Sequence, residues 1–194
     1  MSLVLASASS IRAAMLAAAG VKVLVDPARV DESAVKRAND GNDDAVARAL
    51  AEAKALETGS RHPKSWVVGG DSLVSVAGRR FDKPANREDA AAHLRVFSGQ
   101  RMQLTSAVAL AHDGRIDWAY VGEAALHVRH LSERFIHTYL EAEWPAVGAC
   151  VGVFRMEGRG VTLFDAVEGD HFTILGMPLI PLLGALRQRG LMAS

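Results

Sequence analysis

The chain has 194 residues, of which 49% are hydrophobic, and its 22 basic residues balance 22 acidic ones. This length suits one α/β domain over residues 1–194, and the even charge argues against a protein that holds nucleic acid on a basic surface. A single cysteine, no signal-peptide pattern and no apolar stretch long enough to cross a bilayer indicate a cytoplasmic protein without membrane or nucleic-acid partners.

The first third of the chain alternates short apolar runs with alanine-rich segments of helical periodicity. Apolar runs predict buried strands, and apolar residues three or four positions apart predict helices. Gly20 and Gly59 are expected to end two of the helices. In chain order we expect a strand at 2–6, a helix at 11–19, a strand at 21–25, a polar loop at 26–41 and a helix at 43–57.

The remaining two thirds mix long hairpins with helices. The Asp113-Gly114 pair is a strong hairpin signal, and Asn86 is a good helix N-cap. We therefore expect an α/β fold with a mixed, twisted sheet and flanking helices. The expected elements are a strand at 66–76 with a turn at Gly69-Gly70-Asp71, a hairpin at Gly78, a helix at 86–97, strands at 103–112 and 117–129, a helix at 132–143, a strand-rich segment to 172 and a helix at 178–188.

The segment from Ser7 to Arg12 leads from a strand into a helix. Free N–H groups and the positive dipole end of a helix attract anions. Ser7 and Ser9 add hydroxyl donors, and Arg12 adds a planar, permanently charged fork. The segment is therefore a candidate phosphate site, although an ordinary serine cap followed by a surface arginine explains the same residues.

Carboxylates and lysines elsewhere complete a set typical of phosphate chemistry. Glu32 and Asp71 offer the hard oxygen ligands that Mg²⁺ or Mn²⁺ prefers, and Lys54, Lys83 and Arg12 offer positive charge for a triphosphate. Alone, each is an ordinary surface or turn residue. Either a bound metal activates the attacking water or Asp71 takes its proton. No protein nucleophile is needed, because phosphoryl transfer relies on positioning and charge neutralisation.

These motifs, in this order, resemble the Maf family of nucleotide pyrophosphatases, also described as septum-formation inhibitors. The resemblance runs nearly end to end and combines several motifs in one short chain. It is carried by Leu5–Arg12, Val30-Asp31-Glu32, Leu50–Ala55, Gly69-Gly70-Asp71, Lys83-Pro84, Ser98-Gly99 and Gly176-Met177-Pro178-Leu179.

The resemblance implies hydrolysis of nucleoside triphosphates between the α and β phosphates, giving a nucleoside monophosphate and pyrophosphate. It implies a divalent cation, Mg²⁺ or Mn²⁺, as cofactor, a homodimer, and an elongated two-lobed domain with a central cleft, similar to the inosine triphosphate pyrophosphatases. It places the catalytic aspartate at Asp71 and the metal at Glu32 and Asp71. The phosphate- and substrate-binding positions are Ser7, Arg12, Lys54 and Lys83, with the hydroxyl of Ser9 beside them.

Ile11, Ser72 and Glu157 fall at the positions that set base choice in this family. Most members have Pro-Arg-Arg where this chain has Ser10-Ile11-Arg12, so one arginine is missing. The branch acting on 7-methyl-GTP also lacks that arginine and has an aromatic residue in its place. That branch shares the cysteine at Cys150 and the glutamate at Glu157, whereas the branch acting on dTTP and UTP carries glutamine there.

Glu157 favours 7-methyl-GTP for a physical reason. A carboxylate accepts two hydrogen bonds from the N1–H and N2–H₂ edge of guanine, whereas the carbonyls of uracil or thymine repel it. Against this, Ile11 has no ring to stack on a cationic base, and Ser72 stands where that branch has glutamine. A solvated turn glutamate is the plain alternative for Glu157.

Three other functions stay open on the sequence. The chain could act on dTTP and UTP, or it could be a weakly catalytic nucleotide-binding regulator of septum formation, as the missing arginine at Ile11 suggests. The two carboxylates Glu32 and Asp71 argue against a pure binder. Release of the terminal phosphate is disfavoured only by the resemblance.

Overall fold

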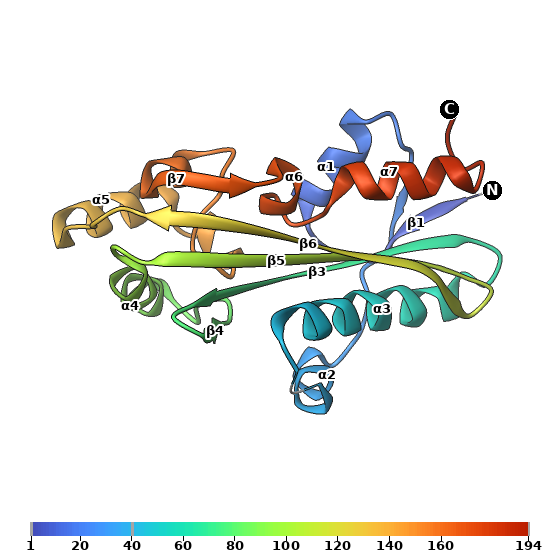
Figure 1. Cartoon of the computed structure of the whole chain (residues 1–194), viewed down its shortest axis with the longest axis horizontal. Coiled ribbons are helices and arrows are strands. Elements are labelled where there is room, and N and C mark those ends of the chain that lie inside the picture. Colours follow the sequence, from blue (N-terminus) through green and yellow to red (C-terminus); the bar gives the residue numbers. More distant parts are fainter. Residues whose placement is uncertain (1, 40, 194) are drawn as a thin grey trace. The chain divides into compact units, whose positions relative to one another are not determined.

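A computed structural model describes residues 2–39 and 41–193 (Figure 1). Within these residues the strands form a seven-stranded sheet in the order β2-β1-β3-β5-β6-β7, with β4 paired to β3. β1 (Leu3–Leu5) pairs in parallel with β2 (Leu24–Val25) and β3 (Trp66–Val76). β3 pairs antiparallel with β4 (Arg79–Phe81). The sheet is therefore mixed, which confirms the expected fold class.

The described residues divide into two compact units. The first comprises residues up to 72 together with 105–122 and 170 onward, and the second comprises 73–104 and 123–169. β3, β5 (Arg101–His112) and β6 (Arg115–Val128) contribute residues to both units. The helices of the first unit are α1 (Ser10–Ala18), α2 (Glu32–Ala38), α3 (Asp43–Arg61), α6 (His171–Ile174) and α7 (Leu179–Gln188). None of the helices that the structure describes has the length and apolar character needed to cross a membrane.

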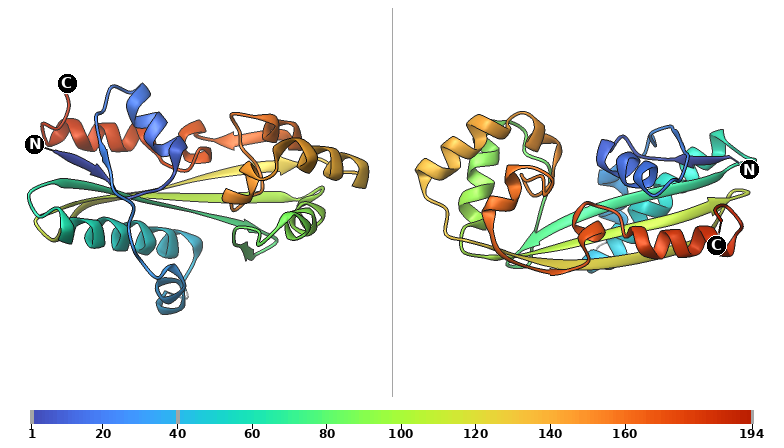
Figure 2. Two further views of the ribbon diagram at one scale, coloured as in Figure 1. Left: turned by 180° about the vertical axis from the view of Figure 1, so that it is seen from behind. Right: turned by 90° about the horizontal axis from the view of Figure 1, so that it is seen from above.

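Helices cover both faces of the first unit's strands, with α1 and α7 on one side and α3 on the other (Figures 1 and 2). The core under α1 and α7 includes Leu16, Val68 and Leu182, all fully or almost fully buried. Because strand residues alternate between faces, the neighbours of Val68 in β3 turn toward α3. Val67 does so, since a Cβ on the α3 residue Gly59 would lie 3.9 Å from its Cγ2.

The expected turn at Gly69-Gly70-Asp71 is wrong, because β3 runs through it without a break. The glycines serve close packing instead. A Cβ on Gly69 would lie 2.1 Å from the carbonyl oxygen of Ala51 in α3, so only glycine lets the helix backbone approach the strand. Asp71 therefore lies within the strand and not at its end.

Three other expectations need correction. Residues 26–41 contain a helix that was not expected, α2, which Asp31 caps by accepting a hydrogen bond from the Ala34 N–H at 3.0 Å. Helix α3 passes Gly59 and ends at Arg61, where ion pairing of Arg61 with Glu57 at 3.0 Å supports the last turn. The segment after α5 (Glu133–Glu143) forms two short 3₁₀ turns, Ala146–Ala149 and Arg159–Leu163, and the single strand β7 (Phe164–Gly169) before α6, where several strands were expected.

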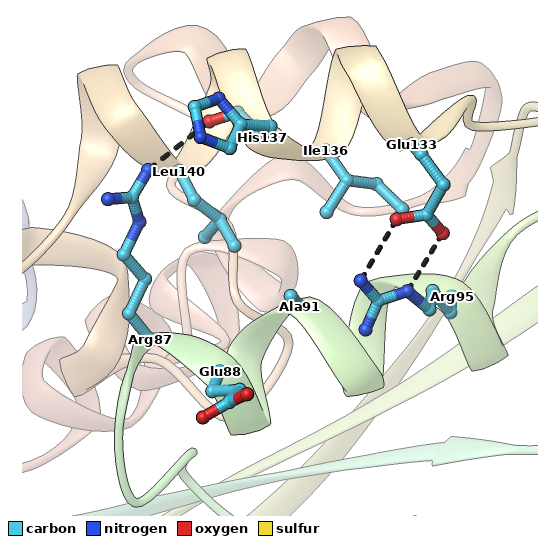
Figure 3. A pocket seen from close by; sticks show the side chains of 8 residues that line it. All are labelled: Arg87, Glu88, Ala91, Arg95, Glu133, Ile136, His137 and Leu140. Atoms are coloured by element: carbon cyan, nitrogen blue, oxygen red, sulfur yellow. Dashed lines mark hydrogen bonds and ion pairs between the residues drawn. The ribbon is translucent and has the colours of Figure 1, made fainter.

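The second unit packs α4 (Arg87–Phe97) against α5 (Glu133–Glu143). Asn86 and Ser132 cap these helices, as expected for both. An open groove runs between them, and Figure 3 shows Arg95 forking onto Glu133 at its rim. The two nitrogen–oxygen distances of this pair are 2.8 and 2.9 Å. Strand β7 pairs antiparallel with β6 within this unit.

Candidate active site

Arg12 is the most heavily bonded side chain of the candidate site, and only 9% of the residue is exposed. Its Nε donates to the Gly176 carbonyl at 2.8 Å. Its Nη1 donates to Ser7 Oγ at 3.1 Å and to the Gly70 carbonyl at 2.8 Å, and its Nη2 donates to Ser72 Oγ at 3.0 Å. Four of the five guanidinium N–H groups are therefore engaged by the protein, and Arg12 fastens the residues on either side of Asp71.

A short chain of hydroxyl groups extends this network. Ser106 donates from Oγ to the Thr173 carbonyl at 2.8 Å, so its single proton is committed. Ser72 then has one proton for two acceptors, Ser106 Oγ at 2.9 Å and the Gly176 carbonyl at 3.1 Å. The Ser72 oxygen is left to accept from Arg12, and the strand that carries Asp71 is tied through Ser106 to the end of α6.

Lys54 joins the two carboxylates that were expected to bind metal. Its Nζ lies 2.6 Å from Asp71 Oδ1 and 2.6 Å from Glu32 Oε1. Two contacts of 2.6 Å to one atom place these oxygens no more than about 5.2 Å apart. The side chains of Lys54 and Asp71 are 13% and 9% exposed, whereas that of Glu32 is 48% exposed. A buried acid and an exposed acid thus converge on one cation.

The alternation of β3 explains this placement. Gly69 and Asp71 face α3. There Lys54 precedes Ala55, whose backbone nitrogen would lie 2.7 Å from a Cβ on Gly69. Gly70 and Ser72 face the other way, toward Arg12. One strand therefore presents its acid to the lysine on one face and its hydroxyl to the arginine on the other.

The charges of this cluster cancel. Burial lowers the pKa of Arg12, while attraction from Asp71 and then Glu32 raises it, and an arginine remains charged throughout. Two cations, Arg12 and Lys54, thus stand against two carboxylates. Because a triphosphate is strongly anionic, the cluster needs further positive charge to hold one.

A divalent cation fits this donor set in part. Carboxylate oxygens suit Mg²⁺, which usually takes one or two of them and completes its shell with water and substrate phosphates. Within the described residues no group of three His, Cys, Asp or Glu side chains is arranged to hold an ion by itself. Glu32 and Asp71 therefore fit a metal that arrives with the nucleotide better than a permanently caged ion.

The serines of the first motif have local partners. Ser9 is the N-cap of α1 and accepts from the Arg12 N–H at 3.5 Å, as in the plain alternative. Ser7 Oγ accepts from the Ser9 N–H at 3.2 Å as well as from Arg12. Ile11 is half-buried. Sequence reasoning missed Ser106, because it belongs to no motif and its neighbour Thr105 carries a hydroxyl as well.

Two further predicted residues, Lys83 and Glu157, belong to the second unit. There they share an environment with Cys150. Burial raises the pKa of the Cys150 thiol, Glu157 raises it further, and Arg155 and Lys83 lower it. Lys83 and Glu157 thus both act electrostatically on one half-buried thiol.

Comparison with known proteins gives consistent matches along the chain. A relative from Nitrobacter winogradskyi named nucleoside triphosphate pyrophosphatase is 45% identical, over 98% of this chain and 95% of the relative. One of the same name from Sphingopyxis alaskensis is 47% identical over 98% of each chain. A 7-methyl-GTP pyrophosphatase from Rhizobium etli is 43% identical over 97% of this chain and 96% of its own length. The family model described as Maf-like protein matches residues 2–189, and the chain therefore belongs to the Maf-like family.

Proposed function

We propose that this protein hydrolyses nucleoside triphosphates to a nucleoside monophosphate and pyrophosphate. The observation that carries the proposal is the convergence of Glu32, Lys54 and Asp71, with both carboxylates 2.6 Å from Nζ of Lys54. This cluster can hold a cation-bridged polyphosphate and present a buried carboxylate beside it. The names of the relatives from Nitrobacter, Sphingopyxis and Rhizobium support the same reaction.

The proposed cofactor is Mg²⁺ or Mn²⁺, held by Glu32 and Asp71. Such an ion supplies the positive charge that the balanced cluster lacks, and it polarises the phosphoryl group under attack. On the protein side, Lys54, Ser7 and Lys83 are the proposed partners of phosphate oxygens. Ser9 offers its hydroxyl only at the expense of the α1 cap that it makes.

Asp71 is the proposed catalytic residue, in one of two roles. As a general base it would take the proton of the attacking water, and as a metal ligand it would position the ion. In either role its carboxylate must be held still, and Arg12 supports this by bonding to Gly70 and Ser72 on either side. Nucleotide-dependent metal binding by the Asp71→Asn variant separates the roles, because only a ligand role weakens it.

The proposed base-reading residue is Glu157, which favours a guanine-type nucleotide such as 7-methyl-GTP over UTP or dTTP. Its carboxylate matches the two N–H donors of that edge. Ile11 and Ser72 are proposed to shape base choice as well, although the hydroxyl of Ser72 is engaged by Arg12 and Ser106. We also propose that the protein is cytoplasmic and forms a homodimer. Light scattering on the purified protein tests the homodimer.

The direct test incubates the purified protein with Mg²⁺ or Mn²⁺ and 7-methyl-GTP, GTP, UTP or dTTP, and separates the products by chromatography. The expected products are a nucleoside monophosphate and pyrophosphate. Orthophosphate as the first product would indicate attack at the terminal phosphate. Tight nucleotide binding without turnover would favour a regulator of septum formation and would end the proposal.

A further inference from the structure

Helix α5 holds the segment that carries Glu157 at two points, and all the residues involved belong to the second unit. The hydroxyl of Tyr139 donates to the Val153 carbonyl at 2.9 Å. One turn further along, Oε2 of Glu143 lies 3.5 Å from Nε of Arg155. Residues four apart share one face of a helix, so this face of α5 fixes the start of the segment.

The carboxylate of Glu143 lies in an unusual environment for a charged group. Only 9% of its side chain is exposed, and it is the last residue of α5. Burial away from water and the negative end of the helix dipole both make an unpaired carboxylate costly there. Glu143 therefore needs a cation, and among the described residues Arg155 is the one within ion-pair distance.

The pair is close but not hydrogen-bonded. A separation of 3.5 Å between Nε and Oε2 exceeds that of a normal N–H···O bond. Neither of these buried atoms has a hydrogen-bond partner among the described residues. Arg155 is thus held by charge attraction and not by a fixed hydrogen bond, so loss of the charge on Glu143 would release it.

Glu157 is the acceptor to which a released Arg155 would turn. It is exposed and lies two residues further along a tightly folded segment, in which Gly158 N–H donates to the Arg155 carbonyl at 3.1 Å. A Cβ on Gly160 would lie 2.4 Å from that same carbonyl oxygen. In the part of the chain that the structure describes, however, Arg155 makes its ion pair with Glu143 and none with Glu157.

We propose that Glu143 is a positioning residue for base selectivity. Because Glu143 pairs with Arg155, the Glu157 carboxylate remains able to accept hydrogen bonds from a guanine-type base. The inference rests on the proposed function, in which Glu157 reads the base. Without the negative charge of Glu143, Arg155 pairs with Glu157 and occupies the oxygens that the base requires.

The test compares kcat/KM for 7-methyl-GTP and for UTP in the wild type, Glu143→Gln and Glu157→Gln. In Glu143→Gln we expect the selectivity ratio to fall about tenfold or more, toward that of Glu157→Gln, since one bidentate base contact gives discrimination of this order. Because the phosphate site is untouched, kcat for 7-methyl-GTP should change far less than its KM.

The double variant Glu143→Gln/Arg155→Gln separates positioning from a merely structural role. Removing Arg155 removes the competitor for Glu157, so selectivity should return to the wild-type ratio. A structural role predicts a double variant at least as poor as Glu143→Gln. If Glu143→Gln does not fold, Glu143→Asp replaces it, with an intermediate loss of selectivity expected from its shorter reach.

Three results would overturn the proposal. They are an unchanged ratio in Glu143→Gln, no recovery in the double variant, and no effect of Glu157→Gln on base choice. If the wild type releases no pyrophosphate, the proposed function fails by itself. Selectivity is then measured by calorimetry as the ratio of GMP to UMP affinity in the same variants, so the role of Glu143 is decided separately.

Discussion

Nζ of Lys54 lies 2.6 Å from Oδ1 of Asp71, and the two side chains are only 13% and 9% exposed. A pair so far removed from water costs free energy when one partner loses its charge, because the other charge remains buried. Glu32, which also lies 2.6 Å from Lys54, provides a second, exposed partner. The lysine therefore keeps a counter-charge when Asp71 is neutralised, and Asp71 can be tested without loss of the fold.

Asp71→Asn is expected to lower kcat by about 10²- to 10⁴-fold, the usual contribution of a positioned acid or base, while the thermal midpoint stays near that of the wild type. The isosteric amide keeps the shape of the side chain and removes its charge. Glu52→Gln is the matched control on helix α3, because within the described residues Glu52 makes its ion pair with Arg48 at the surface, at 2.8 Å. Full turnover by Asp71→Asn would contradict the catalytic assignment.

Ser106→Ala is expected to destabilise the protein by about 1–3 kcal/mol, the cost of leaving a buried polar group without its partner. The variant takes the donor from the Thr173 carbonyl and leaves Ser72 with the Gly176 carbonyl as its remaining acceptor. Turnover should fall too, because Ser72 and Arg12 then hold the strand around Asp71 less firmly. Denaturant unfolding and steady-state kinetics measure the two effects.

The neighbouring residue supplies the control for that experiment. Thr105 is as fully buried as Ser106, but its hydroxyl makes no hydrogen bond within the described residues. Thr105→Val keeps the shape and removes a polar group that has no partner, so it should be neutral or stabilising. Equal destabilisation by Thr105→Val and Ser106→Ala would show that packing, and not the Ser106 bond, sets the cost.

The fold class could be predicted from the sequence because hydrophobic period, caps and hairpin turns are local signals. Asn86 and Ser132 cap the helices that they were expected to cap. The turn at Asp113-Gly114 has positive φ at both residues, as a two-residue hairpin requires. Short elements with little buried surface were missed, and α2 is the example: none of its residues is buried, so no apolar stripe reveals it.

The candidate site was predictable in its residue types but not in its contacts. Glu32, Lys54 and Asp71 were expected to serve one ligand, and the structure brings them together. The four hydrogen bonds that Arg12 donates within the protein could not be predicted. Two of their acceptors are the backbone carbonyls of Gly70 and Gly176. Backbone acceptors carry no residue-specific signal in a sequence.

Gly69 and Gly59 give opposite expectations for the same substitution. Gly69→Ala puts a methyl group 2.1 Å from the Ala51 carbonyl oxygen, so α3 must move away from β3, and we expect loss of the folded protein or of turnover. Gly59→Ala places its methyl 3.9 Å from Val67 inside α3 and should stabilise by about 0.5–1 kcal/mol through helix propensity. Thermal melts of both variants decide this, and tolerance of Gly69→Ala would refute the close-packing account.

Asp26, the residue after β2, should make the stability of the protein depend on pH in the acidic range. Hydrogen bonds from Arg61 and then His62 lower the pKa of Asp26 from 3.8 to about 2. A carboxyl whose folded pKa lies below its unfolded value stabilises the protein fully above the unfolded pKa and loses this effect as the pH falls toward the folded one. The contribution is therefore present above about pH 4 and disappears by about pH 2.

Asp26→Asn should accordingly lower the thermal midpoint at pH 7 and reduce its fall between pH 4 and pH 2, so that both proteins melt alike at the acid end. The fall is reduced and not abolished, because Arg61 also lowers the pKa of Glu57, which the variant retains. Asp165→Asn, at an exposed position of β7, serves as the control and should follow the wild-type curve. Parallel curves for the wild type and Asp26→Asn across this range would show that the Asp26 contacts with Arg61 and His62 contribute nothing to the acid sensitivity of the fold.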